Sequence, residues 1–81
     1  MDASEAKLKS LWYSVSIHVR KYIEDAVKQG LSSVQQFKSV DYMMYYHAQQ
    51  DAWKLRKLHY NVDFETINFK DSPDNKVTIT W

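Results

Sequence analysis

His47 and Asp51 are the two residues whose types and spacing come nearest to a chemical site. They stand four residues apart in a segment with helical periodicity, so both side chains would lie on one face of a helix. Zinc sites in proteins need at least three such ligands, and no third one follows at a suitable spacing. The chain also has no cysteine. We therefore expect no bound metal and no cofactor, and we interpret the pair as a polar edge of the helix.

The other groups with chemical potential are expected to be structural or solvated. Nucleophilic catalysis needs an activated side chain with a base and an oxyanion hole, and no glycine turn presents a serine here. The acidic pairs Glu24/Asp25 and Asp63/Glu65 are typical of solvated surface charge. The single glycine, Gly30, excludes phosphate-cradling loops. These observations predict a protein that is not an enzyme and has no small-molecule substrate.

The segment from Ser39 to Tyr60 has two apolar faces at helical spacing. One face has the pattern of a core stripe, with Met44, Ala48, Ala52, Leu55 and Leu58. The opposite face is aromatic, where an amphipathic helix usually has a polar back. Interfaces between proteins are enriched in such side chains. The candidate partner-binding residues are Tyr42, Met43, Tyr46, Trp53 and Tyr60.

Two explanations of this aromatic face remain open. Another element of the chain, most plainly a C-terminal hairpin, could cover it, or a partner could. The partner would be another protein or a second copy of the chain, so a homodimer is plausible.

Nucleic acid is the alternative partner. Basic groups beside rings that stack on bases are the means by which proteins hold single strands. The candidate residues for this alternative are Lys54, Arg56, Lys57, Lys70 and Lys76. The net charge of +1 argues against it.

The length of 81 residues indicates one small domain over 1–81. The absence of cysteine from the chain excludes disulfides and fits a reducing compartment. The first ten residues lack the apolar run of a signal peptide, and no apolar stretch is long enough to cross a membrane. We therefore expect a cytoplasmic protein with no membrane partner.

The periodicity predicts two long helices with a short one between them. The first runs from about 3 to 29, capped by Asp2 with Glu5 and ended by Gly30. A short helix at about 33–38 follows, starting from a Ser32/Gln35 capping pattern. The helix at about 40–59 is capped by Ser39 or Asp41, and the two long helices lie roughly antiparallel.

The last twenty residues are rich in β-branched and aromatic residues, which predicts a hairpin at about 62–81. Its turn is placed at Asp71–Asn75 around Pro73. Ile67 and Phe69 are expected to share a buried face with Val77 and Ile79, with a bulge near Glu65. The predicted fold class is thus α+β: two long helices joined by a short one, followed by a two-stranded antiparallel hairpin.

In size and composition the chain resembles the small accessory regulators that bacteriophages encode. It is short, free of cysteine and rich in aromatic residues, with one glycine and one proline. The resemblance implies an inhibitor or accessory regulator that acts by binding a partner protein.

Overall fold

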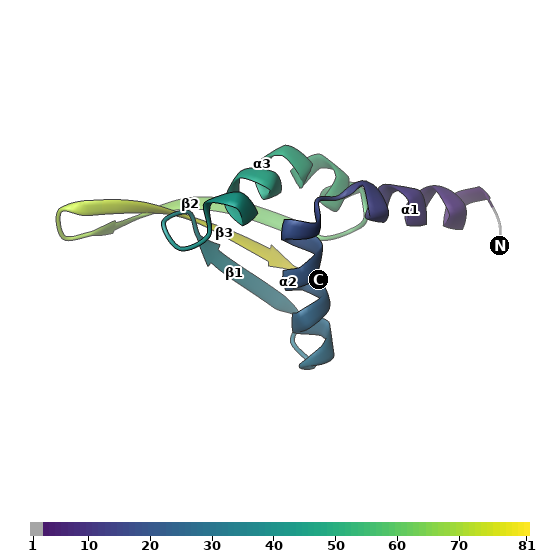
Figure 1. Ribbon diagram of the computed structural model, residues 1–81, viewed down its shortest axis with the longest axis horizontal. Helices are drawn as coiled ribbons and strands as arrows, with labels where there is room; N and C mark the ends of the chain where they lie inside the picture. The colour runs from purple at the N-terminus through teal and green to yellow at the C-terminus, as the bar shows by residue number, and fades with distance from the viewer. Residues whose placement is uncertain (1–2) are drawn as a thin grey trace.

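The computed structural model describes residues 3–81 as three helices and a three-stranded antiparallel sheet (Figure 1). Asp2, the expected first cap, lies outside the described residues. The elements follow one another as α1 (Ala3–Ser14), α2 (Ile17–Lys28), β1 (Ser33–Phe37), α3 (Tyr42–Lys57), β2 (Asn61–Phe69) and β3 (Ser72–Thr80). The class is α+β, but the predicted arrangement of two long helices and a two-stranded hairpin is wrong.

The first long helix is broken into α1 and α2. Residues Val15 and Ser16 leave the helical path, and α1 and α2 run in different directions in Figure 1. Ser16 becomes the N-cap of α2, since its side chain accepts from the His18 N–H at 3.2 Å. The far end was correctly predicted: α2 ends at Lys28, and Gly30 takes the left-handed conformation with φ 76°.

Three side chains hold the break by binding the backbone groups that it releases. Asp51 of α3 accepts from the Ser16 N–H at 2.9 Å. Lys54, one turn further along α3, donates to the Ser14 carbonyl at 3.0 Å. Arg20 donates to the Val15 carbonyl at 2.9 Å. Because buried backbone groups need such partners, the bend is built into the packing of α2 against α3.

The expected short helix at 33–38 is instead the strand β1. It pairs antiparallel with β3, placing Val34 opposite Ile79 and Gln36 opposite Val77. The Ser32/Gln35 pattern is compatible with a helix of one or two turns, but such a short helix is marginal. Pairing with β3 gives the same residues a full hydrogen-bonded ladder, and this long-range partner decides the structure.

The hairpin is formed by β2 and β3, and its register is continuous from Asn61 opposite Thr80 to Phe69 opposite Ser72. There is therefore no bulge between these strands. The turn lies at Lys70–Asp71, where Lys70 has a φ of 44°, rather than around Pro73. Pro73 lies inside β3, beyond the stretch that β1 pairs, so its missing N–H breaks no bond to β1.

This register reverses the expected faces of β2. Val62 and Phe64 lie opposite Ile79 and Val77 and face the helices, whereas Ile67 and Phe69 were predicted to do so. The buried core joins α2 and α3 to that face of the sheet. Its residues are Val15, Val19, Ile23, Met44, Tyr45, Ala48, Ala52, Leu55, Val62, Val77 and Ile79. α2 and α3 thus cover the same side of the sheet.

Removing the Asp51 carboxylate tests the role of the bend in stability. Asp51 is 8% exposed, so Asp51→Ala leaves the Ser16 N–H without its partner. We expect a loss of about 1–3 kcal/mol in the free energy of unfolding, measured by urea denaturation. Asp51→Asn keeps an acceptor oxygen of the same shape and should lose less. Equal stability of Asp51→Ala and the unchanged protein would contradict this role.

Candidate functional site

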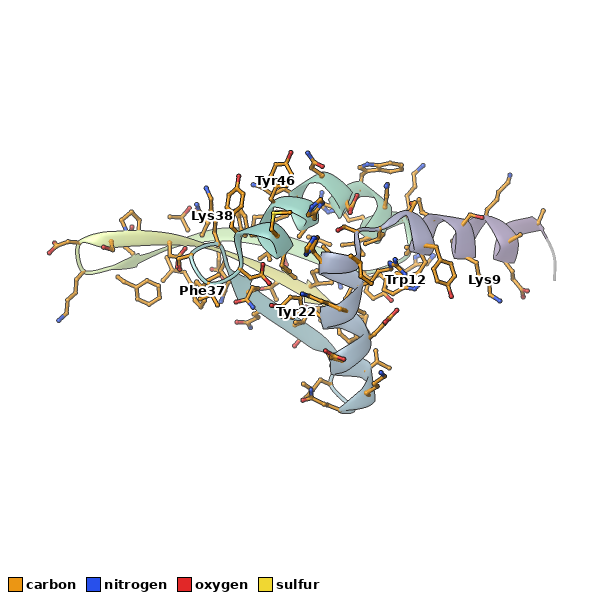
Figure 2. All side chains as sticks on the ribbon, in the orientation of Figure 1. Lys9, Trp12, Tyr22, Phe37, Lys38 and Tyr46 are labelled. Carbon is orange, nitrogen blue, oxygen red and sulfur yellow. The ribbon has the colours of Figure 1, made fainter. Side chains whose placement is uncertain are left out.

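The candidate site is the outer face of α3, the side turned away from the sheet. The stripe of Met44, Ala48 and Leu55 is fully buried, so the helix has its core face against α2 and the sheet. No element among residues 3–81 covers the opposite face, and Figure 2 shows Tyr46 pointing away from the sheet. The exposed large side chains of this face are Tyr42 (55%), Met43 (44%), Tyr46 (39%) and Trp53 (54%).

The first half of this face is held in a fixed arrangement by its own contacts. Tyr42 and Tyr46 stack with ring centroids 5.9 Å apart and planes 17° from parallel. Gln50 donates to the Tyr46 hydroxyl at 2.7 Å. The Lys38 ammonium lies 5.8 Å from the centroid of the Tyr42 ring. Side chains ordered before binding lose less entropy when a partner arrives.

Trp53 forms the second half of the face with two lysines. The Lys57 ammonium lies 5.4 Å from its ring centroid and the Lys54 ammonium 5.8 Å. Lys54 also bonds to Asp51 and to the Ser14 carbonyl, so it belongs to the helix bend. The indole therefore offers an apolar surface with cationic groups at its rim.

Tyr60 does not join the other four candidates. The helix ends at Lys57, and His59 takes a positive φ of 72° that turns the chain back. The Tyr60 ring then packs inward, stacked on Trp12 at 5.9 Å and edge-on to Trp81 at 5.8 Å. Burial raises the pKa of the Tyr60 hydroxyl. The structure therefore places Tyr60 in the packing between α1 and the end of β3.

The basic residues named for nucleic-acid binding are spread over the molecule. Arg56 donates to the Val62 carbonyl at 2.9 Å, and Lys76 pairs with Glu65 at 2.9 Å. Lys70 lies in the hairpin turn, which Figure 1 shows at the far end from the last turn of α3. Lys57 remains beside Trp53, so one end of the aromatic face is basic.

His47 and Asp51 take separate roles. Asp51 is the buried acceptor of the helix bend, whereas His47 stacks on His18 with ring centroids 5.1 Å apart. Within residues 3–81, no three His, Cys, Asp or Glu side chains are grouped so that they could hold a metal ion. A shallow hollow of about 450 Å³ lies along α1 and is lined by Ala6, Lys7, Ser10, Leu11 and Ser14.

Asp41 anchors the start of the candidate face. It caps α3 by accepting from the Met44 N–H at 3.0 Å, and the Tyr22 hydroxyl of α2 donates to its other oxygen at 2.7 Å. The hydrogen bond from Tyr22, followed by the one from the Met44 N–H, lowers the pKa of the Asp41 carboxyl. The bond between Tyr22 and Asp41 also raises the pKa of the Tyr22 hydroxyl. Sequence reasoning offered Asp41 as a cap, but Tyr22 carried no signal of this role.

No family model, curated protein or solved structure matches the chain. None of the helices in the described part of the chain combines the length and the apolar character that crossing a membrane requires.

The Tyr22–Asp41 contact predicts a specific acid sensitivity. Because the folded pKa of Asp41 is lowered, its contribution to stability is present above the unfolded value and is lost as the pH falls through the folded pKa. Urea unfolding at a series of pH values below about 4 measures this loss. Tyr22→Phe removes the larger cause of the shift, so its stability should fall less steeply with acid. An unchanged slope would contradict the assignment.

Proposed function

We propose that the protein is a non-enzymatic binding or regulatory protein that contacts a partner protein through the outer face of α3. The observation that carries the proposal is the exposure of Tyr42, Met43, Tyr46 and Trp53 together on one helix face. Tyrosine, tryptophan and methionine are enriched at the centres of interfaces, and tryptophan and tyrosine supply much of the binding energy. In this proposal, binding to the partner lets the protein act as an inhibitor or accessory regulator of the kind that bacteriophages encode.

Charge supports an acidic rim on the partner. None of the exposed residues of α3 is acidic, and the last turn adds Arg56 and Lys57. Lys38 stands over Tyr42 at the other end of the helix. Charges at the rim of an interface guide encounter and register more than they add to affinity. The apolar rings would thus supply the affinity, and the lysines would favour a partner with carboxylates at the edge.

A second candidate is single-stranded nucleic acid. Trp53 is exposed with two lysine ammonium groups within 6 Å of its ring, and a stacked base flanked by phosphates would fit the same groups. The dispersal of Lys70 and Lys76 limits the area over which such a strand could be bound.

Three alanine variants of the full-length chain test the proposal against cell lysate. The unchanged protein and Tyr13→Ala should retain the same bound protein, whereas Tyr46→Ala and Trp53→Ala should lose it. Tyr13 is a matched control, because it is 66% exposed but lies on α1. A central aromatic side chain costs about 2 kcal/mol or more when truncated, which is a loss of roughly 30-fold in affinity.

Circular dichroism and filter binding complete the test. All three variants should keep the folded spectrum; loss of folding in Tyr46→Ala or Trp53→Ala would show that these rings are core and would contradict the proposal. Filter binding of single-stranded RNA that is strong at low salt and falls steeply with added salt would favour the second candidate. Retention of the same bound protein by every variant would place the interface elsewhere.

A further inference from the structure

The bonding directions of the three strands leave backbone groups pointing away from the sheet along both outer strands, β1 and β2. The Trp81 N–H donates to the Ser32 carbonyl at 2.9 Å, and the Lys38 N–H donates to the Asn75 carbonyl at 2.8 Å. Bonding direction alternates along an antiparallel strand, so odd-numbered residues of β3 bond toward β1 and even-numbered ones toward β2. Even-numbered residues of β3 lie opposite odd-numbered residues of β2. The N–H and C=O groups that point away from the sheet therefore belong to Val62, Phe64, Thr66 and Asn68.

The two edges of the sheet differ in how much of this backbone is already bound. On β1, the Phe37 N–H donates to the side-chain oxygen of Gln36, and the Phe37 carbonyl accepts from the Val40 and Asp41 N–H groups. On β2, the Arg56 guanidinium donates to the Val62 carbonyl at 2.9 Å. Arg56 thus closes one end of the β2 edge and leaves the stretch from Phe64 to Asn68 open, where the hairpin extends past α3 in Figure 1.

The side chains on the outer face of β2 define what could pair with this edge. Asp63 and Glu65 come first, followed by Ile67 and Phe69, at alternate positions on the face opposite the helices. Phe69 is 50% exposed and meets Phe37 of β1 edge-on at 5.8 Å. An added strand would set its own side chains directly opposite these four. Glu65 already pairs with Lys76 of β3 at 2.9 Å, so the need for a cation is strongest opposite Asp63. The face therefore calls for cations at one end and apolar side chains at the other.

A second copy of the chain does not meet these requirements. Antiparallel pairing of β2 with itself must keep even-numbered residues opposite even-numbered ones. The registers that pair the open stretch then place Glu65 opposite another Glu65, or opposite Ile67 or Phe69. Like charges directly opposite one another destabilise a strand pair, and a carboxylate facing an apolar side chain gains nothing.

We infer that the open edge of β2 binds an extended segment of another protein as a fourth strand. The segment runs antiparallel to β2, with apolar side chains opposite Phe69 and Ile67 and basic side chains opposite Glu65 and Asp63. Main-chain bonds to Phe64, Thr66 and Asn68 supply affinity, and the alternating side chains supply specificity. This site is separate from the outer face of α3.

A synthetic peptide tests the inference by fluorescence anisotropy with the full-length chain. The peptide Thr-Ile-Thr-Ile-Thr-Lys-Thr-Lys-Thr should bind in the predicted direction. A peptide with glutamate in place of both lysines, and one N-methylated on its central threonines, should each bind about tenfold more weakly or worse. Equal binding of all three peptides would overturn the inference.

Variants of the protein locate the site. Thr66→Pro removes an N–H that points away from the sheet, so it should keep the folded spectrum and weaken the lysine peptide. Gln35→Pro makes the same change on the β1 edge and should leave binding unaltered, as should Trp53→Ala on α3. Asp63→Lys leaves the backbone intact and should weaken the preference for the lysine peptide over the glutamate peptide, because the new lysine repels the lysine opposite it and attracts the glutamate.

Two results would contradict the proposal that a segment of another protein binds the β2 edge. Undiminished binding by Thr66→Pro and an unaltered preference in Asp63→Lys would show that the peptide binds elsewhere. Self-association of the unchanged chain that Thr66→Pro abolishes would show that a second copy occupies the edge.

Discussion

The buried carboxylate of Asp51 is the contact on which the arrangement of the helices depends. It accepts the Ser16 N–H, which in a continuous helix would bond four residues back along its own chain. With that N–H bound by α3, the chain can turn between α1 and α2. The turn brings Val19 and Ile23 against the core stripe of α3. Lys54 pairs with the same carboxylate at 3.4 Å and holds the carbonyl on the other side of the turn.

The consequence of this packing is a molecule with uncovered surfaces on both of its outer sides. α2 and the sheet share one face of α3, so that its aromatic face has no covering element among residues 3–81. α2 and α3 lie on one face of the sheet, and no element among residues 3–81 covers the opposite face of the hairpin. A chain of 81 residues buries a limited share of its surface, and here that share lies in a single layer of contacts. The proposed partner surfaces are the regions that this layer leaves out.

The parts of the fold that local sequence determines were predictable. Gly30 ends a helix because it alone takes a left-handed conformation without cost, and Met44, Ala48 and Leu55 repeat at the helical period. The same period placed Tyr42, Tyr46 and Trp53 on the opposite face of α3 but left open whether the hairpin would cover them. Asp41 was one of two candidate caps, with Ser39, and the structure shows that Asp41 is the N-cap.

The remaining features depend on residues far away in the chain. The break at Ser16 is made by Asp51, thirty-five positions later, and the first helix shows no interruption in its own period. β1 is a strand because β3 pairs with it, and β3 comes after every other element. The faces of β2 follow from the register that the turn at Lys70–Asp71 sets, and shifting a register by one residue reverses every side chain of the strand. Sequence patterns placed that turn at the only proline.

Distances between spin labels on α1 and α2 test the bend most directly. The chain has no cysteine, so Lys7→Cys with Lys28→Cys provides two unique labelling sites on exposed positions. A continuous helix would separate their backbones by about 32 Å, at 1.5 Å per residue. A bend at Ser16 gives one shorter distance in the unchanged background, and adding Asp51→Ala should shift the distance toward about 32 Å. A single separation of about 32 Å in both proteins would contradict it.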